Sequence, residues 1–504
     1  MHSPIITPAQ MRAAEEAAFA RGITAEALME EAGAGIARAL EKFFPQPGRC
    51  LVFAGKGHNA GDAFVAARWL ISSGWEIESR LVYPEDELSA LTKQKLNELR
   101  EAQSGRGLCA PIPGVAAIGA RRLLPHSFIL LDGLLGLGAH PPLREPIRSA
   151  CREINSLGEN GCQIIAIDLP TGLDADSGAA DADCVVADFT ITVGSAKSGL
   201  VADPALDFVG RLEVVVLDDL RRDELPLVEG LAIPESLRPL LPRRKFSSYK
   251  NQFGRLGIVA GARGFTGAAL MCSLGALRAG AGLVEVFVPE EIYDIVAGAA
   301  PPEAMVKPVK TYRGLLREPV DAWAIGPGLG KGRAAEVLRL MREARQPMVI
   351  DADGLNLLAE KINALKKIRG PRLLTPHPGE MKRLFPNEKN SRAETAAAFC
   401  QKYSVTLLLK GSRTIVAEAG KPLSYNTTGN PGMATGGMGD VLTGVCGALL
   451  GAKLSPYDAA CLGAWICGRA AELAIFNGNA SEESLLPRDV LENLGGAFNE
   501  IRKG

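Results

Sequence analysis

A chain of 504 residues is too long for one hydrophobic core, because such cores stop growing at roughly 250 to 300 residues, and we expect two domains. Apolar residues make up 47% of the chain and aromatic residues 5%, with 56 glycines. This composition favours an α/β protein and argues against disordered and fibrous classes. The net charge of −1 provides no basic field for a nucleic-acid backbone, so nucleic acid is not an expected partner.

The ten cysteines lack a C-x-x-C pair and the spacing of a zinc site, and we expect reduced, mostly buried thiols. The first residues place Glu15 and Glu16 in a helical pattern and lack the apolar stretch of a signal peptide. No uninterrupted apolar run reaches the roughly 18 residues that cross a bilayer. These observations predict a cytoplasmic protein without a membrane partner.

The sequence pattern of the N-terminal part predicts helices followed by the strands of a parallel sheet. Apolar spacing over residues 7–44 predicts two helices separated by a turn at 21–24. Short apolar runs that each end in a polar or glycine-rich turn predict strands at 50–54, 128–132, 164–168 and 189–193, with a helix at 62–72. Ligands gather beyond the carboxyl ends of such strands, so Gly55, Asp132 and Asp168 are expected to line one crevice.

A change of pattern marks the expected domain boundary. Between Leu217 and Arg244 the strand pattern gives way to charged residues and four prolines, which places the boundary near residue 225, between domains 1–225 and 226–504. A second α/β series then predicts strands at 256–260, 283–288, 322–325, 348–351, 372–374 and 406–410. The two halves show no internal repeat.

Three segments of the first domain carry polar groups suited to a ligand. The glycine-rich residues 55–62 lie between a strand and a helix, where amides and the helix dipole can receive an anion, although glycines can also simply shape a tight turn. Asp132 and Asp168 each end a strand, a position equally compatible with a capping or turn role. Together with Asn59 and Thr171 they supply oxygen ligands for a hard cation.

These segments, in this order, resemble the NAD(P)H-hydrate epimerase domain over about residues 1–220. The resemblance implies a Rossmann-like three-layer αβα fold and potassium held by Asn59, Asp132 and Thr171. The residues that it implies as substrate contacts are His58, Asn59, Ala60, Gly61, Asp62, Gly136, Leu137, Gly138, Ala139, His140, Pro141, Pro142 and Asp168. The family usually has Asn where His58 stands and Gly where Ala60 stands, which leaves the backbone role intact and puts the side-chain role at 58 in doubt.

The implied chemistry suits a carboxylate. In the hydrate, the hydroxyl lies on the ring carbon next to the nitrogen, whose lone pair can expel it and leave a planar cation open on both faces. A positioned carboxylate can move the proton in both directions. We expect Asp168 to be this catalytic group.

The second domain carries a glycine-rich segment, residues 426–440, that leads into a predicted helix at 441–450. Its amides can converge on an anion with Asp440 beside the reacting group, which suits phosphoryl transfer. Lys410 and the four residues after it follow a strand and can meet nucleotide phosphates. His377 follows another strand and is equally open to a structural role. Residues 326–332 are not a Walker loop, because Gly332 stands where Ser or Thr is required.

Together with residues 264–269 and 351–356, these segments resemble the ribokinase-like NAD(P)H-hydrate dehydratase over about residues 230–500. The resemblance implies that Ala268, Gly328, His377 and Asp440 contact the hydrate. It implies that the nucleotide is contacted by Lys410, Gly411, Ser412, Arg413, Thr414 and Gly439. Bacterial-type members use ADP and eukaryotic ones ATP, and the fusion of two domains looks bacterial, so ADP is expected.

Phosphoryl transfer to the hydroxyl would turn it into a group that the ring nitrogen can expel. Asp440 would accept the hydroxyl proton, with Mg²⁺ offsetting phosphate charge, to give AMP, phosphate and NADH or NADPH. The expected partners are the small-molecule hydrates of NADH and NADPH and ADP, in a homo-oligomer. Two alternatives remain: a small-molecule kinase of the same fold, for a sugar or vitamin precursor, and a first domain that serves only as a binding module.

Overall fold

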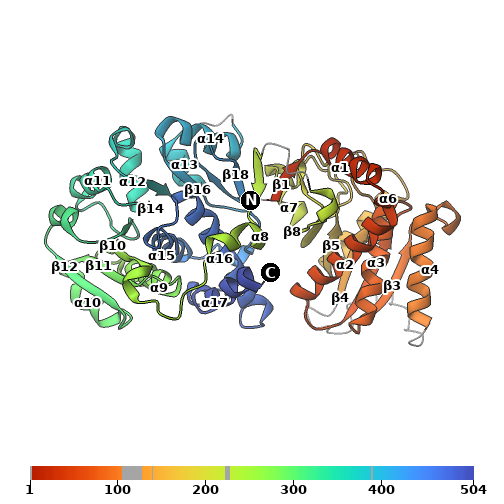
Figure 1. The fold of residues 1–504 in the computed structure, drawn as a ribbon, viewed down its shortest axis with the longest axis horizontal. Helices are drawn as coiled ribbons and strands as arrows, with labels where there is room; N and C mark the ends of the chain where they lie inside the picture. Colours follow the sequence, from red (N-terminus) through yellow and green to blue (C-terminus); the bar gives the residue numbers. More distant parts are fainter. Residues whose placement is uncertain (1–2, 105–127, 139, 222–226, 387–389, 504) are drawn as a thin grey trace. The chain divides into compact units, whose positions relative to one another are not determined.

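The computed structural model describes residues 3–104, 128–138, 140–221, 227–386 and 390–503 (Figure 1). The chain divides into two compact units, residues 4–226 and residues 227–504 together with residues 1–3. Each unit is an α/β structure built around a mainly parallel sheet.

The N-terminal unit contains a parallel sheet with the strand order β3-β2-β4-β5-β6-β8 and a short parallel pair, β1 with β7. The strands are β1 (Ser3–Ile6), β2 (Arg49–Ala54), β3 (Glu76–Leu81), β4 (Phe128–Gly133), β5 (Gln163–Ile167), β6 (Phe189–Val193), β7 (Ala196–Lys197) and β8 (Arg211–Val215). The helices are α1 (Pro8–Ala20), α2 (Ala25–Phe43), α3 (His58–Ser72), α4 (Ala90–Ser104), α6 (Ile147–Glu159) and α7 (Leu206–Val209).

The strand order of this sheet reverses between β2 and β4. The β2-α3-β3 and β4-α6-β5 crossovers run in opposite directions along the sheet, so right-handed connections place α3 and α6 on opposite faces. Leu51, Phe53 and Leu130 are buried on the face that α6 covers. The result is the expected three-layer αβα domain. Its switch point, where ligands bind in open α/β sheets, lies between the carboxyl ends of β2 and β4.

The C-terminal unit contains a sheet in the order β12-β11-β10-β13-β14-β15-β16-β17-β18-β9. The neighbouring pairs from β12 to β16 are parallel, β17 is antiparallel to both β16 and β18, and β18 is parallel to β9. The strands are β9 (Glu229–Leu231), β10 (Arg255–Val259), β11 (Leu283–Pro289), β12 (Ala304–Val309), β13 (Ala322–Ile325), β14 (Met348–Ile350), β15 (Arg372–Leu374), β16 (Thr406–Leu409), β17 (Thr414–Ala417) and β18 (Leu423–Asn426). Here the order reverses between β10 and β13, which places a second switch point at their carboxyl ends.

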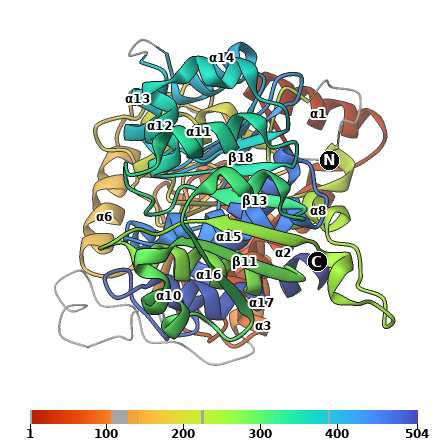
Figure 2. The same cartoon turned by 90° about the vertical axis from the view of Figure 1, so that its left-hand side faces the viewer.

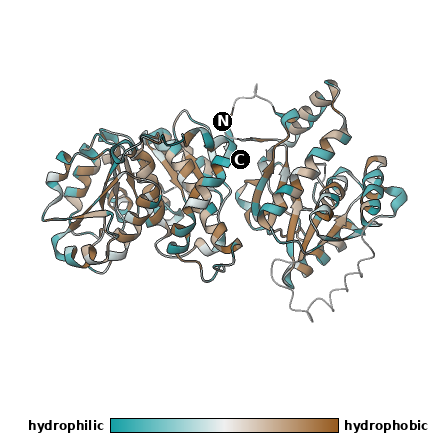
Figure 3. Cartoon of the chain, turned by 60° about the horizontal axis from the view of Figure 1, so that its bottom comes forward, coloured by the Kyte–Doolittle hydropathy of each residue, from teal (hydrophilic) through white to brown (hydrophobic). Residues whose placement is uncertain are grey.

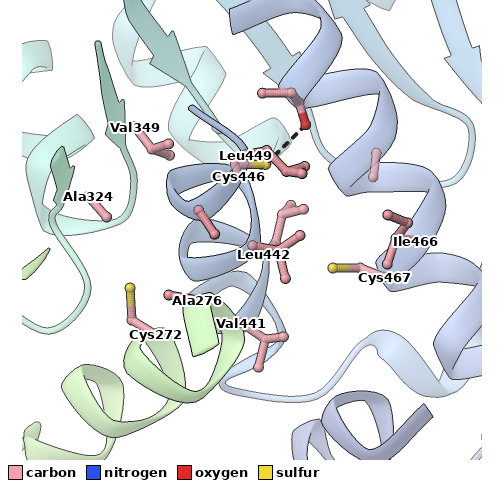
Figure 4. Close-up of a cluster of buried hydrophobic side chains, with 14 of the residues drawn as sticks. Cys272, Ala276, Ala324, Val349, Val441, Leu442, Cys446, Leu449, Ile466 and Cys467 are labelled. Atoms are coloured by element: carbon pink, nitrogen blue, oxygen red, sulfur yellow. Dashed lines mark hydrogen bonds between the residues drawn. The ribbon is translucent and has the colours of Figure 1, made fainter. Parts of the chain in front are cut away.

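Helices cover both faces of this second sheet (Figure 2). They are α8 (Pro234–Leu237), α9 (Thr266–Arg278), α10 (Tyr293–Ala299), α11 (Ala334–Glu343), α12 (Asp353–Glu360), α13 (Pro378–Leu384), α14 (Arg392–Tyr403), α15 (Met438–Gly451), α16 (Pro456–Phe476) and α17 (Pro487–Lys503). Residues of α9, α15 and α16 form the larger core cluster with one face of the strands, where Cys446 Sγ lies 3.7 Å from the Ala459 carbonyl (Figure 4). Met341 of α11 and Leu358 of α12 lie against Ile350 on the other face.

Hydrophobic residues concentrate in the strands and the central helices (Figure 3). Among the residues that the structure describes, one helix, α16, has the length and apolar character of a membrane span, but 83% of its apolar window is buried inside the protein. α16 is therefore a core helix of the C-terminal unit. Nine cysteines in the described ranges are free and buried, as expected for reduced thiols.

Most predicted elements are confirmed, with one correction that concerns the site. The helices on either side of the turn at 21–24 and the predicted strands are present, whereas the helix expected at 62–72 begins at His58. Gly57 is the N-cap of α3 and Ala60 donates its amide to the Gly57 carbonyl, so the glycine loop is only three residues long. His58 to Asp62 therefore belong to the first turns of a helix.

Close packing of α9 against α15 generates a stability prediction. A Cβ on Gly444 would lie 2.0 Å from the Cys272 carbonyl oxygen, so Gly444→Ala must push the two helices apart and should cost about 1–3 kcal/mol of unfolding free energy. Gly495, on the exposed side of α17 with no atom near its virtual Cβ, is the matched control, and Gly495→Ala should be neutral or stabilising. Denaturant unfolding measures both changes; equal stability of the two variants would contradict this packing.

Candidate active sites

A buried carboxylate organises the N-terminal switch point. Asp132 is fully buried at the end of β4. Its Oδ2 accepts the Thr171 amide at 2.8 Å, and its Oδ1 accepts the Thr171 hydroxyl at 2.8 Å and the Leu134 amide at 3.2 Å. Burial raises the pKa of Asp132 to about 6, although these hydrogen bonds oppose the rise. The segments after β4 and β5 are thus joined through one side chain.

Asn59 completes this group of oxygen atoms from the first turn of α3. Its Nδ2 donates to the Leu135 carbonyl at 3.0 Å, and the Leu135 amide donates to Thr171 Oγ1 at 3.2 Å. The Asn59 Oδ1 atom is buried and has no hydrogen-bond partner within the described residues. An unpaired buried acceptor is costly, so this oxygen is suited to a ligand. Gly55 permits the close approach of β2 and β4, because a Cβ there would lie 2.0 Å from the Leu134 carbonyl oxygen.

Asp168 follows β5 and adopts a positive φ of 65°, which aspartate tolerates better than most residues. Its Oδ1 accepts the Thr192 hydroxyl at 3.1 Å, the Val193 amide at 3.2 Å and the Lys197 ammonium in a short ion pair. The Lys197 side chain is 1% exposed and also donates to Thr192 Oγ1 and to the Val193 carbonyl. Asp168 is therefore held by three donors, one of them a buried cation.

Two further carboxyl groups belong to this site. Burial, followed by the negative charges of Asp168 and Glu15, raises the pKa of Asp62 well above its usual range, and Lys197 opposes the rise. Burial and the charge of Asp168 also raise the pKa of Glu15. Sequence reasoning missed Lys197 and treated Glu15 only as a helical residue. The available signal for Lys197 was a lysine in the short segment between Gly194 and Gly199 that follows an apolar strand.

Described residues of the segment 136–142, which is expected to contact the substrate, lie beside this group. Gly136 packs against Asn59, because a Cβ on Gly136 would be 3.4 Å from Asn59 Cβ. Arg12 of α1 donates to the Leu137 carbonyl at 3.3 Å, and His140 Nδ1 lies 3.1 Å from Asp174 Oδ2. The predicted contact residue Ala139 lies outside the described residues. His58 is exposed at the start of α3, whereas Asn59 and Ala60 are buried.

In the C-terminal unit, the start of α15 packs against an ion pair. Asp351, 1% exposed after β14, accepts the Lys410 ammonium at 2.7 Å and the Thr443 hydroxyl of α15 at 2.8 Å. A Cβ on Gly439 would lie 3.3 Å from Asp351 Oδ2 and 3.4 Å from Lys410 Nζ, so glycine allows this approach. Asp440 follows in the first turn of α15, where burial and the charge of Asp351 raise its pKa to about 7 against the effect of Lys410.

The predicted nucleotide segment is a loop held from its side by an arginine. The Arg392 guanidinium of α14 donates to the Ser412 carbonyl at 2.7 Å and to the Arg413 carbonyl at 3.4 Å. Ser412 is exposed, whereas Arg413 is 8% exposed and has a φ of 52°. Gly411 and Ser412 therefore offer an accessible backbone, and Lys410 joins this loop to Asp351.

The other predicted hydrate contacts lie after β13 and at the starts of α9 and α13. Gly328, with a φ of 61°, packs on Phe265 and Ala268, and its virtual Cβ would be 3.0 Å from Ala268 Cβ. His377 is the N-cap of α13, where its Nδ1 accepts the Gly379 amide at 3.0 Å. The His377 side chain is 51% exposed, so it caps the helix and still leaves its ring accessible to a ligand.

A buried network that sequence reasoning missed anchors the glycine-rich segment. The Gly429 amide donates to Glu472 Oε1 at 2.8 Å, and Glu472 pairs with Arg469 at 2.8 Å. Arg469 also pairs with Glu500 of α17 at 2.7 Å. The glycine-rich segment that leads to Asp440 is therefore anchored at Gly429 to α16, and α16 is in turn paired with α17.

Each unit therefore places a lysine–aspartate pair and a second carboxylate at the carboxyl edge of a parallel sheet, the arrangement of a two-site α/β enzyme. The profile of the NAD(P)H-hydrate dehydratase family matches residues 256–494, and that of the YjeF-related protein N-terminus matches residues 25–199. A bifunctional NAD(P)H-hydrate repair enzyme from Gloeobacter violaceus is 36% identical, over 94% of this chain and 95% of that protein. One from Escherichia coli is 37% identical, over 92% and 88%.

A solved structure of an ADP/ATP-dependent NAD(P)H-hydrate dehydratase from Bacillus subtilis, co-crystallised with ATP and Mg²⁺, is 28% identical. It covers 56% of this chain and 100% of that one, with a TM-score of 0.48. The chain belongs to the family of bifunctional NAD(P)H-hydrate repair enzymes. This membership favours the repair interpretation over the kinase alternative.

The lysine beside Asp440 generates a titration prediction. Lys410→Met removes the cation that lowers the pKa of Asp440, so that pKa should rise above its value of about 7 in the original chain. Lys366→Met, at an exposed position, is the matched control and should leave the pKa of Asp440 unchanged. Carbon-13 NMR of labelled aspartates, with Asp440→Asn to assign the signal, measures the change. A downward shift in Lys410→Met would contradict this description.

Proposed function

We propose that the N-terminal unit interconverts the R and S epimers of hydrated NADH and NADPH, and that the C-terminal unit dehydrates the S epimer with ADP. The observation that carries the proposal is the Asp440 carboxylate in the first turn of α15, directly after Gly439, which packs against the Asp351–Lys410 pair. Helix amides that face an anion beside a carboxylate suit phosphoryl transfer to a hydroxyl. The domain limits, 1–225 and 226–504, are part of this proposal.

In the dehydration, the β-phosphoryl group of ADP passes to the ring hydroxyl of the hydrate, and AMP leaves. Asp440 accepts the hydroxyl proton, for which its raised pKa makes it a competent base near neutral pH. The ring nitrogen then expels phosphate, and loss of a proton from the neighbouring ring carbon restores the double bond. Ala268, Gly328 and His377 are the proposed hydrate contacts. Residues 410–414 and Gly439 are the proposed nucleotide contacts.

Magnesium fits this site through its donor chemistry. Mg²⁺ is usually held by nucleotide phosphates, water and one or two carboxylates, and the carboxylates here are Asp440 in the first turn of α15 and Asp351 after β14. When bound, the ion would neutralise phosphate charge. The contribution of the chain is the placement of Asp440 beside the hydroxyl and of Lys410 beside Asp351.

In the epimerisation, we propose that Asp168 exchanges a proton with the oxygen that leaves or enters the ring. The proposed substrate contacts are His58 to Asp62, Gly136 to Pro142 and Asp168. Potassium fits the oxygen atoms of Asn59, Asp132 and Thr171, because Asn59 Oδ1 is a buried acceptor without a partner among the described residues. When bound, potassium would fix the loops after β4 and β5 and attract substrate phosphate.

Three further expectations accompany this function. ADP is proposed over ATP because both activities are fused in one chain. Action in the cytoplasm and assembly into a homo-oligomer stay predictions. The substrates are small molecules, and neither nucleic acid nor membrane is a proposed partner.

Replacing the proposed base tests the separation of the two activities. Asp440→Asn should reduce ADP consumption and dehydration by a factor of about 10² to 10⁴, while epimerisation stays within twofold of the original rate. The matched control is Asp294→Asn, at an exposed position of α10. Chromatography of both epimers and of AMP follows each reaction separately. Full dehydration by Asp440→Asn would contradict the assignment of Asp440.

A further inference from the structure

The epimerase site brings together three carboxyl groups in two different environments. Asp168 accepts hydrogen bonds from Thr192, Val193 and the buried Lys197. Asp62 and Glu15 are half-buried, and their carboxyl groups have no hydrogen bond or ion pair with any described residue. One carboxylate of the site is thus tied to a cation, and the other two are not.

The chain path accounts for this gathering. Asp62 lies in the second turn of α3, directly beyond the carboxyl end of β2, and Asp168 directly follows β5. Glu15 lies on α1, which follows the pairing of Ile6 in β1 with Lys197 in β7. Met11 of α1 packs against Gly194, whose virtual Cβ would be 2.7 Å from Met11 Cε. The groups that act on Asp62 are therefore Asp168, Glu15 and Lys197, with Arg12 acting on Glu15.

Epimerisation through a planar cation requires two proton-carrying groups. The carbon–oxygen bond breaks on one face of the ring, and the departing hydroxyl takes a proton and leaves as water. A second water forms the new carbon–oxygen bond on the opposite face and gives up a proton. A single carboxyl group on one face of the ring cannot exchange protons with both the departing hydroxyl and the attacking water. Two carboxyl groups in unlike environments can do so, one as the acid and the other as the base.

We propose that Asp62 donates the proton to the departing hydroxyl, that Asp168 accepts the proton from the attacking water, and that Lys197 positions Asp168 for this role. The reverse epimerisation uses the same groups with donor and acceptor exchanged. After each turnover the proton on Asp168 returns to Asp62 through solvent, which restores both groups for the next turnover. Burial and two neighbouring negative charges, which raise the pKa of Asp62, favour its protonated form. The proposal rests on the epimerase function of the N-terminal unit.

The test uses the full chain with Asp440→Asn, so that the S epimer is not consumed. In this parent, the rate of R-to-S conversion should fall as the pH rises through the raised pKa of Asp62, because the neutral acid is lost. Asp62→Asn should lower kcat by about 10² to 10⁴ and remove this alkaline decline. Glu15→Gln removes one repelling charge and should move the decline to lower pH.

Lys197 is tested by a pair of variants. Lys197→Met should lower kcat at least tenfold with a KM within a factor of about two, and Lys197→Arg should recover part of the loss, because the cation is restored. Each substitution is also made in the chain that retains Asp440. The dehydratase rate and the thermal unfolding of these variants show whether they are folded.

The outcomes separate the two proposals. A parent that does not exceed the spontaneous epimerisation rate overturns the epimerase function itself. An active parent in which Asp62→Asn keeps both the original rate and the alkaline decline overturns only the role of Asp62. An active parent in which Lys197→Met changes neither kcat nor the pH profile overturns the positioning role of Lys197.

Discussion

The ion pair between Lys410 and Asp351 sets the position of the proposed dehydratase base. Asp351 binds Thr443 of α15 through one oxygen and Lys410 through the other, so the strands β14 and β16 and the helix meet at one carboxylate. Gly439 lets the helix start approach this pair, and Asp440 follows beside it. Removal of one partner from a buried pair is costly, so we regard this contact as the constraint on which the geometry of Asp440 depends.

The N-terminal unit uses the same physical arrangement on a different sheet. Lys197 is buried against Asp168, and Asp62 lies beside them with a raised pKa, as Asp440 does beside Asp351. In each unit one carboxylate is paired with a lysine and a second is left unpaired where burial and like charge favour protonation. Both groups lie near the carboxyl ends of parallel strands, where ligands gather in open α/β sheets. The resemblance concerns chemistry, because the two halves share no sequence repeat.

Sequence patterns predicted the groups that belong to short motifs. Asp132, Asp168 and Asp440 were found because each ends a strand or opens a helix within a glycine-containing run. The pairing of Lys410 with Asp351 was not predicted, because 59 positions separate the two residues and only the sheet order brings them together. Lys197 and Glu15 were not predicted for the same reason. The Arg469–Glu472 pair was not predicted because it lies in the apolar helix α16, where the periodicity of the sequence indicates only that residues are buried. The early start of α3 was missed because Gly57 and Gly61 suggested a longer loop.

The most direct measurement of the whole scheme incubates the chain with both epimers of hydrated NADH, with ADP, with ATP or without nucleotide. Without nucleotide, the two epimers should interconvert and no NADH should form. With ADP and Mg²⁺, both epimers should be converted completely, with one AMP and one phosphate for each NADH, seen as recovered near-ultraviolet absorbance. A phosphorylated product that persists without recovery of NADH would contradict the account.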